Sequence, residues 1–367
     1  MNRALSSLAA AALISTLAAC GGGGGSATQP VVISPPVVIS PPVVIDPPVV
    51  IDPPVVPADA VSAKGTLNAT PAASTYAAGS AEASAYDAIN VVRTGAGAGP
   101  LNHAATLDVA AMAHTTYLIT NMADGISHSE DAKKPDFYAA SPPERMVKAG
   151  YAVGNATETI GGSTLTGADY VYDMLSTVYH GASLLGLFND IGFTFKVDPK
   201  YTYQTLGTAD LASVAGNGQV PAAGALVAYP FNGQAGVIET FDVDNETPRV
   251  STALLPNATA GAPIIVSVRN ADYVNFWATR TLDVKVTQFV LKDGSGNIVP
   301  SIILCHSFIT GAAGVTVNAD EHLREGFVIL VPKSPLLKGQ AYTYTFSATL
   351  KTGATVTTKT SQFTTTS

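Results

Sequence analysis

Residues 177–195, TVYHGASLLGLFNDIGFTF, are the stretch from which the fold of the first half of the chain can be worked out. His180 stands four residues ahead of a short apolar run. The run contains side chains that proteins usually bury: Leu184, Leu185, Leu187 and Phe188. It therefore predicts a core segment. Only 13% of all residues are charged, so a titratable ring beside a packing segment needs an explanation.

Upstream of this stretch, two helical patterns are separated by the turn-like sequence TGAGAGP. Apolar residues recur at helical spacing in both patterns: Ala85, Ile89 and Val92, and then Leu107, Ala110, Ala111 and Leu118. His114 lies on the apolar face of the second pattern, so we expect a packed core histidine there. His103, at the entrance of that helix, is expected to be exposed.

Downstream, from residue 229 to the end, the sequence changes to strand patterns. Runs rich in Val, Ile and Thr occur at residues 262–268, 281–291, 326–331 and 341–350, with a last run at 355–366. The sequences KDGSGN and KTGA predict hairpin-like turns between such runs. Strands with turn signals and no intervening helix predict an antiparallel β-sandwich of immunoglobulin-like type over residues 229–367. The acidic segment DVDNE, Asp242 to Glu246, is expected to be solvated surface, with Ca²⁺ binding as the alternative.

The amino terminus resembles a bacterial lipoprotein signal. Residues 1–19 combine Arg3 with the small, apolar run ALSSLAAAALISTLAA, which is too short to span a bilayer comfortably. The run ends in LAAC, which resembles a lipobox and predicts that Cys20 is lipidated. Gly21 stands where Asp would retain a Gram-negative lipoprotein in the inner membrane, so the resemblance favours the outer membrane. The alternative is that Cys20 is a buried thiol.

Residues 20–57 predict a lipidated cysteine followed by a Gly-rich and Pro/Val-rich linker. The sequences PPVVIS and PPVVID repeat with a six-residue period between Pro30 and Pro57. Proline fixes its own φ and disfavours helix before it, and Val and Ile are stiff, so the repeat predicts an extended spacer. At about 3.1 Å per residue it would reach roughly 90 Å. Residues 58–79 continue as linker. Pairing of the repeats as strands is the alternative.

The net charge of −8 and the isoelectric point near 5.1 offer no basic surface for a polyanion. Nucleic-acid binders usually concentrate Lys and Arg on one face. We therefore expect the partners to be the membrane, through the lipid anchor, and a lipid or cell-wall ligand, and we expect no nucleic acid.

Several short motifs occur in a defined order between Ser80 and Gly207. Asn-x-x-Arg at 90–93 precedes GAGPLNHAATLDVAAMAH and then His128. Arg145 stands before the sequence AGY, and Glu158 opens the turn-like sequence ETI. MLSTVYHGASLL at 174–185 and YTYQTLG at 201–207 close the series.

In this order the motifs resemble the CAP superfamily, which joins cysteine-rich secretory proteins, antigen 5 and pathogenesis-related 1 proteins. The resemblance implies an α+β fold, with an α-β-α sandwich over residues 80–210 and a linker at 211–228 before the immunoglobulin-like domain. The chain departs from the family at Met174, where Trp is usual, at Gly181, where Arg is usual, and at Thr159, where Asn is usual.

The resemblance also implies a central cleft that brings together His128, Glu158 and His180. Glu130 is a candidate for the second acidic residue of this cleft, and Asp173 is another. Two imidazoles and a carboxylate are ligands suited to Zn²⁺, so His128, His180 and Glu158 form the candidate metal site. The alternative is that the two rings only brace the cleft.

Three functions remain open. The first is a tethered cell-envelope binding module that holds a divalent cation, a small apolar ligand or a cell-wall ligand; it predicts that binding survives removal of the residues after Asp210. The second is a metal-dependent hydrolase with Glu158 or Glu130 as base. The third is a display or adhesion protein with a vestigial cleft. Catalysis is undecided, although the sequence has no nucleophile elbow or zinc-protease helix motif.

Overall fold

The structure is a computed structural model that describes residues 67–163, 166–197, 200, 205–214, 218–219, 221, 225–268, 284–324, 326–350 and 355–367. The signal segment, Cys20 and the Pro/Val repeat lie outside the described residues. The described residues belong to one compact unit. We call Ala81–Val214 the N-terminal module and Val227–Thr365 the C-terminal module. The chain has an α+β fold with several sheets.

The N-terminal module contains helices α1 (Ala81–Ala96), α2 (Ala105–Thr120), α3 (Pro142–Lys148), α4 (Gly167–Leu175) and α5 (Tyr179–Leu184), and the 3-10 turn η1 (Met122–Asp124). Its strands are β1 (Asn102–His103), β2 (Val153–Ser163), β3 (Asp190–Val197) and β4 (Thr205–Val214). They pair in the order β1-β3-β4-β2, with β1 parallel to β3 and the other neighbours antiparallel.

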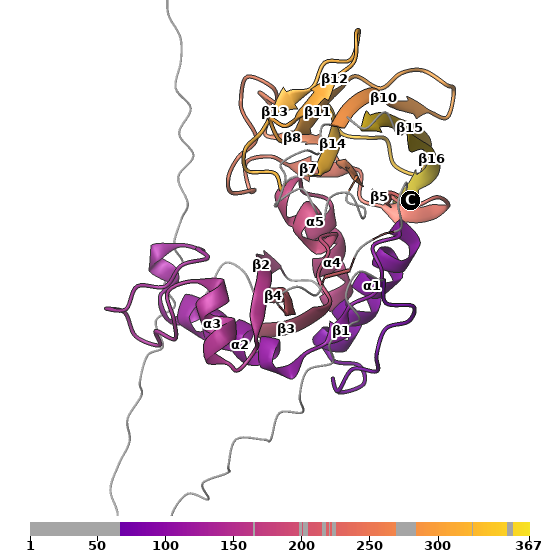
Figure 1. The fold of residues 1–367 in the computed structure, drawn as a ribbon. Coiled ribbons are helices and arrows are strands. Elements are labelled where there is room, and N and C mark those ends of the chain that lie inside the picture. Colours follow the sequence, from indigo (N-terminus) through magenta and orange to yellow (C-terminus); the bar gives the residue numbers. More distant parts are fainter. Residues whose placement is uncertain are drawn as a thin grey trace, which may run out of the picture. The chain divides into compact units, whose positions relative to one another are not determined.

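Helices lie on both faces of this sheet (Figure 1). On one face α2 and α3 pack against β2, β3 and β4; on the other, α1, α4 and α5 cover β2 and β3. The side chains of β4 alternate accordingly, because successive residues of a strand point to opposite faces. Ala209 and Leu211 join the core beneath α1 and α4, whereas Ala212 joins the core beneath α2 and α3.

Helix α1 has a capping residue at each end. The Ser80 hydroxyl accepts a hydrogen bond from the Ala83 N–H, and Gly97 ends the helix with a positive φ of 82° that suits glycine. Within the helix, Arg93 is fully buried and donates to the carbonyls of Gly99 and Leu184, at 2.9 and 2.7 Å. Burial lowers the pKa of Arg93 to about 9, so its guanidinium keeps its charge at neutral pH.

The prediction that His103 is exposed was wrong. Its side chain is 4% exposed, and its Nε2 lies 2.6 Å from the Asp108 carboxylate. The ring also packs 4.0 Å, centroid to centroid, from Tyr76. Because Asp108 is in the first turn of α2, one turn after His103, the pair forms locally. The sequence NHAATLD already contained both partners.

The C-terminal module is a β-sandwich. One sheet has the order β12-β10-β15-β16-β6 and the other β13-β11-β14-β9-β5. Their bounds are β5 (Val227–Tyr229), β6 (Gln234–Val237), β9 (Ile264–Ser267), β10 (Val284–Asp293), β11 (Ser301–Cys305), β12 (Ile309–Gly311), β13 (Asn318–Ala319), β14 (Phe327–Pro332), β15 (Ala341–Leu350) and β16 (Thr355–Thr365). A separate pair joins β7 (Thr240–Asp242) to β8 (Thr259–Gly261).

The predicted strands are present, but the sandwich is not purely antiparallel. Strands β12, β13 and β6 pair in parallel with β10, β11 and β16. The sequence KDGSGN forms a turn with a single bridge between Lys292 and Ile298, after which the chain crosses to the other sheet. KTGA lies outside the described residues and connects β15 to β16, which pair as a hairpin.

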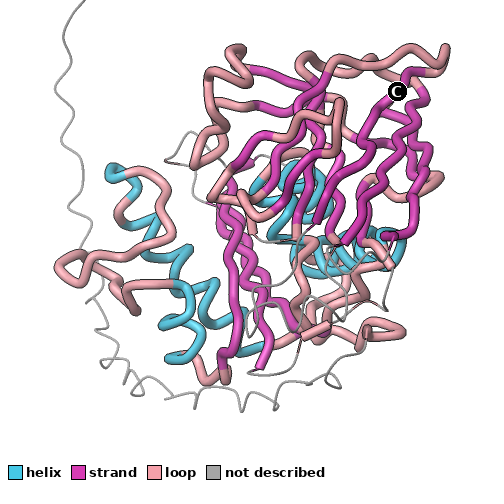
Figure 2. Tube along the Cα trace, turned by 45° about the horizontal axis from the view of Figure 1, so that its top comes forward, coloured by secondary structure: helices cyan, strands magenta, loops and turns pink. Residues whose placement is uncertain are grey.

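The two modules share one core, whereas the sequence predicted two cores joined by a linker at 211–228. Strand β4 extends through Val214 into that predicted linker. One face of sheet β13-β11-β14-β9-β5 packs on the other sheet, and the opposite face joins the core of α1, α4 and α5 through Ile265, Phe327 and Ile329. The helices, cyan in Figure 2, all precede residue 185 in the described residues, and strands of the C-terminal module lie against one group of them, α1, α4 and α5.

Candidate functional site

Glu158 lies in β2 at the centre of a buried group of charged side chains. Its carboxylate is completely buried, with Oε1 2.8 Å from His128 Nδ1 and Oε2 2.8 Å from Arg145 Nη2. Burial alone raises the pKa of Glu158, but the His128 hydrogen bond and the charges of His114 and Arg145 outweigh it and lower the pKa. The carboxylate therefore stays ionised at neutral pH. Both of its oxygens are engaged by neighbouring side chains.

His128 lies in the loop between η1 and α3. Arg145 Nη2 donates to the His128 carbonyl at 3.0 Å, which holds this loop against β2. An ionised carboxylate can only accept hydrogen bonds, so Nδ1 of His128 is the donor to Glu158. Nε2 has no hydrogen-bond partner among the described residues, and the side chain is 46% exposed. In the neutral ring, Nε2 is thus a lone-pair acceptor at the protein surface.

His114 and Glu130 lie behind this pair and are both completely buried. His114 Nδ1 is 2.8 Å from Glu130 Oε1, and its Nε2 is 2.9 Å from the Ser127 carbonyl. Both ring nitrogens therefore face oxygen atoms that can accept a hydrogen bond. His114 is a core histidine, as predicted, but it belongs to the charged group of the site.

Glu130 does not face the cleft, contrary to the role the sequence suggested. Its carboxylate accepts from His114 and, at 2.7 Å, from the Tyr138 N–H, and it has no exposed surface. It therefore cannot serve as a base for a ligand in the cleft. Its position orients His114.

Asp210 lies directly beside Glu158, because the two residues are register partners in β2 and β4. Asp210 is completely buried; its carboxyl group interacts with that of Glu158, and neither of its oxygens has another hydrogen-bond partner in the described structure. Burial, and then the nearby charge of Glu158, raise the pKa of Asp210 well above its ordinary value. Asp210 is therefore neutral beside an ionised Glu158.

His180 lies in α5 and has a carboxylate partner from the other module. Its Nδ1 is 3.3 Å from Glu246 Oε1, and the Glu246 side chain is completely buried. Glu246 also accepts from the backbone N–H groups of Val178 and Tyr179, at 2.9 and 2.6 Å. The prediction that the segment 242–246 is solvated was wrong at Val243 and Glu246, whereas Asp242, Asp244 and Asn245 are exposed.

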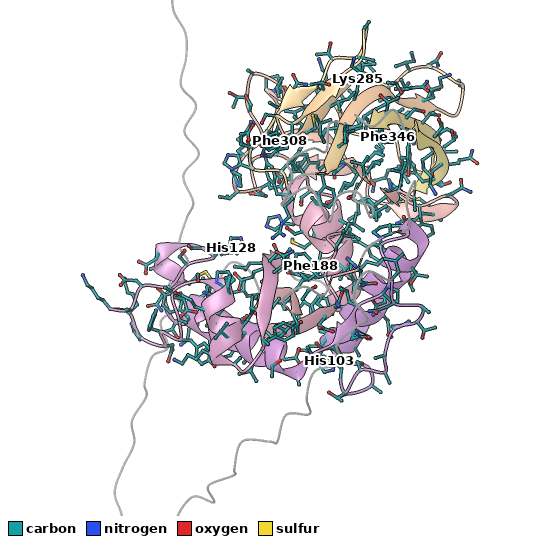
Figure 3. All side chains as sticks on the ribbon, viewed as in Figure 1. His103, His128, Phe188, Lys285, Phe308 and Phe346 are labelled. Atoms are coloured by element: carbon teal, nitrogen blue, oxygen red, sulfur yellow. The ribbon has the colours of Figure 1, made fainter. Side chains whose placement is uncertain are left out.

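The rings of His128 and His180 line the same two cavities. The smaller cavity, of about 330 Å³, has Glu158 in its wall and is closed by residues of the C-terminal module: Thr247, His322 and Arg324. The larger cavity, of about 640 Å³, continues past both rings toward Asp173, Thr177, Asp242 and Asn245. The two predicted histidines thus line both cavities. Figure 3 shows His128 at the margin of the N-terminal module, whereas Phe188 lies inside it.

The arrangement does not fit the three-ligand metal site that the sequence suggested. Among the described residues, no group of three or more His, Cys, Asp or Glu side chains could hold a metal ion. One reason is the position of Glu158, because His128 and Arg145 contact both of its carboxylate oxygens. Glu158 therefore supports His128 rather than standing beside it as a ligand. A cation at the two imidazoles stays a prediction.

The residues that sequence analysis missed come from the C-terminal module: Glu246, His322 and Arg324. Arg324 Nη2 donates to the carbonyl of Ala156 at 2.9 Å, and its guanidinium lies 5.1 Å from the Phe188 ring centre. The sequence had one indirect signal for this packing. Strands whose two faces are both buried read as continuous apolar runs, as FVILVP does in β14.

Comparisons with known proteins assign no family to the chain. No family model matches it, and no curated protein matches it. Among solved structures, an outer surface protein from Borrelia burgdorferi is similar, with 15% sequence identity and a TM-score of 0.30. The similarity covers 35% of this chain and 89% of that protein. In the part of the chain that the structure describes, no helix has the length and hydropathy needed to cross a membrane.

Proposed function

We propose that this chain is a lipid-tethered binding protein of the bacterial cell envelope, and that its cleft between His128 and His180 holds a small, hydroxyl-bearing cell-wall ligand. The tether rests on the lipobox-like sequence ending at Cys20 and on the Gly21 that follows it. The ordered motifs between Ser80 and Gly207 support a CAP-type α-β-α sandwich as the carrier of the cleft. The outer membrane is the proposed location.

One observation carries this proposal. Two imidazoles line a common pair of cavities, and each presents its Nδ1 to a completely buried carboxylate. Buried charges are costly unless they are paired, so two such pairs at one cleft are a specific arrangement. It leaves Nε2 of each ring for a ligand. A core that only needed bracing could use apolar side chains for the same purpose.

The surfaces around the rings favour a ligand with hydroxyl groups over a purely apolar one. Hydroxyl side chains line both cavities: Thr157, Tyr179 and Ser183 in the smaller, and Ser127, Ser129, Ser176 and Thr177 in the larger. Some of these hydroxyls donate within the protein, as Tyr179 does to Asp320 and Thr177 to the Met174 carbonyl, and their oxygens can still accept from the hydroxyls and amides of a ligand. Tyr179 and His322 meet edge to face at 6.0 Å and add an aromatic surface to the smaller cavity. Cell-wall glycan fragments combine these features.

The competing functions have less support from the geometry. Hydrolysis with Glu158 as base requires a carboxylate that can receive a proton from a ligand, but Glu158 is buried and already paired. A display role with a vestigial cleft does not account for buried carboxylates at both rings. A Zn²⁺ ion on the two rings remains part of the proposal, with water or ligand atoms completing its coordination.

Calorimetric titration tests the proposal. The full chain in detergent is titrated with a soluble disaccharide-peptide fragment of cell wall and, separately, with ZnCl₂. His128→Ala and His180→Ala should each weaken binding about 10-fold or more, since each ring contributes a ligand contact worth about 1.4 kcal/mol. His306→Ala is the matched control, because His306 lies outside both cavities and pairs with Glu321. Equal binding by all three variants, or no binding of either titrant to the unaltered chain, would refute the proposal.

A further inference from the structure

Glu246 is a buried acid in an otherwise exposed acidic segment. It follows β7 in the sequence DVDNE, where Asp242, Asp244 and Asn245 form polar contacts near the surface. Glu246 instead points into the molecule and is 2% exposed. Removing a carboxylate from water is costly, so its position requires compensating contacts. These contacts come from the N-terminal module.

The carboxylate of Glu246 is held in one place by backbone groups of the other module. It accepts from the N–H groups of Val178, Tyr179 and His180, the last at 3.2 Å. These bonds engage both oxygens, Oε2 toward Val178 and Oε1 toward Tyr179 and His180. The position of Oε1 is therefore determined by the backbone. Its distance of 3.3 Å to the His180 ring follows from that placement.

The neighbours of the His180 ring define which nitrogen carries hydrogen. Nδ1 faces two groups, Glu246 Oε1 at 3.3 Å and Thr177 Oγ1 at 3.4 Å. The Thr177 hydroxyl donates to the Met174 carbonyl at 2.8 Å, so toward His180 it can only accept. Both neighbours of Nδ1 are thus acceptors, and this favours the neutral ring that carries its hydrogen on Nδ1. Nε2, which has no partner among the described residues, is then the acceptor.

We propose that Glu246 is a positioning residue: the C-terminal module uses it to hold the His180 ring and its Nδ1–H form, so that Nε2 faces the ligand. The consequence of this inference for ligand binding rests on the proposed function, whereas the contacts of Glu246 with α5 do not depend on it. Glu246 faces Nδ1 of His180 at 3.3 Å, a looser contact than the 2.8 Å hydrogen bond between Glu158 and Nδ1 of His128. Carboxylates that bind the far nitrogen of a working histidine fix its orientation and tautomer in this way.

Residues of both modules therefore contribute to the cleft. His128 and its carboxylate both come from the N-terminal module, whereas His180 depends on a carboxylate from the C-terminal module. Gly181 permits the approach, because a Cβ there would lie 2.7 Å from Ile265 Cδ1 of β9.

Nitrogen-15 NMR of the imidazole rings tests this inference directly. In the unaltered chain, at a pH where the ring is neutral, His180 should carry hydrogen on Nδ1 and none on Nε2. Glu246→Ala should shift the ring toward the Nε2–H form and leave the His128 signals unchanged. Glu246→Asp, which keeps the charge, should restore part of the Nδ1–H population. Glu321→Ala, which removes an exposed carboxylate paired with His306, is the matched control and should change neither ring.

The same variants are titrated with the disaccharide-peptide fragment. Glu246→Ala should weaken binding about 10-fold, within the range seen for such supporting carboxylates. A neutral His180 protonated on Nε2 in the unaltered chain would overturn the inference without any variant, even if Glu246→Ala failed to fold. If His180 has the expected form but the fragment does not bind, the proposed function fails and the positioning role stands. Unchanged His180 signals in folded Glu246→Ala would refute the role.

Discussion

At the scale of single residues, the site is a balanced set of buried charges. Arg145 pairs with Glu158, and His114 pairs with Glu130 behind them, all with completely buried side chains. Asp210 is the extra acid, and its raised pKa keeps it neutral. This balance explains how a chain with few charged residues can bury so many of them near one cleft. Pairing is what makes the burial tolerable.

Because the pKa of Asp210 is raised, we predict that the free energy of unfolding decreases as the pH rises. The folded chain keeps a proton on Asp210 that the unfolded chain releases above about pH 4, so stability is lost as pH rises from there through the raised pKa. Asp210→Asn removes this loss. We expect it to match the unaltered chain near pH 4 and to be more stable by about 1 to 3 kcal/mol at pH 8.

Urea unfolding at the two pH values measures this difference. The exposed Asp87→Asn is the control and should show no such pH dependence. If Asp210→Asn were less stable than the unaltered chain at pH 8, an ionised Asp210 with an unseen partner would be indicated instead.

At the scale of elements, Arg93 joins the end of α1 to the segment that carries the site. Its guanidinium donates to the carbonyls of Leu184 and Gly186, at 2.7 and 2.8 Å, directly after α5. It also contacts the carbonyls of Ala98 and Gly99 in the turn before β1. No carboxylate partner is needed, because several carbonyl dipoles share the charge. The Arg93 side chain thus holds both the turn before β1 and the chain at the end of α5 in place.

Replacing Arg93 tests that function. Lysine keeps the charge but cannot reach the separated carbonyls, because it has one nitrogen instead of a planar fork. We expect Arg93→Lys to lower the free energy of unfolding by about 2 to 4 kcal/mol. Arg249→Lys, at a partly exposed ion pair with Asp244, should cost less than about 1 kcal/mol. Thermal and urea unfolding compare the two, and equal losses would argue against a special role for Arg93.

At the scale of the whole described unit, sheet β13-β11-β14-β9-β5 is the shared layer of both modules. One face packs on the second sheet of the sandwich and the other on α1, α4 and α5. The expectation that binding survives removal of the residues after Asp210 is therefore not supported. Such a deletion would expose Leu184 and Val178 of the N-terminal module, remove Glu246 and cut β4 before Val214.

We expect the full chain to unfold in one cooperative transition by calorimetry, because both modules bury the same sheet. A chain ending after Val214 should show no cooperative transition and no binding. As control, removal of residues 1–57 should leave the transition temperature unchanged within a few degrees. Two separate transitions in the full chain, or a folded truncated module, would contradict the shared core.

The elements were predictable to the extent that their patterns are local. The apolar spacing of 85–92 and 107–118 predicted α1 and α2, and the Val- and Thr-rich runs predicted β9, β10, β14, β15 and β16. Predictions from local patterns were wrong where contacts with a partner residue determine whether a side chain is buried. His103 is buried by Asp108 and Tyr76, and Glu246 by amides 66 to 68 positions away.

The sequence by itself predicted α1, α2 and the main strands of the C-terminal module, because periodicity is a property of neighbouring residues. The resemblance of its ordered motifs to a known family implied that His128, Glu158 and His180 lie together, and in the structure all three line one cavity. Only the tertiary structure decided that Glu158 supports His128, that Glu130 is buried behind it, and that Glu246 serves His180. These roles depend on how sheet β13-β11-β14-β9-β5 packs on α5, and contacts between distant segments leave no spacing in the chain.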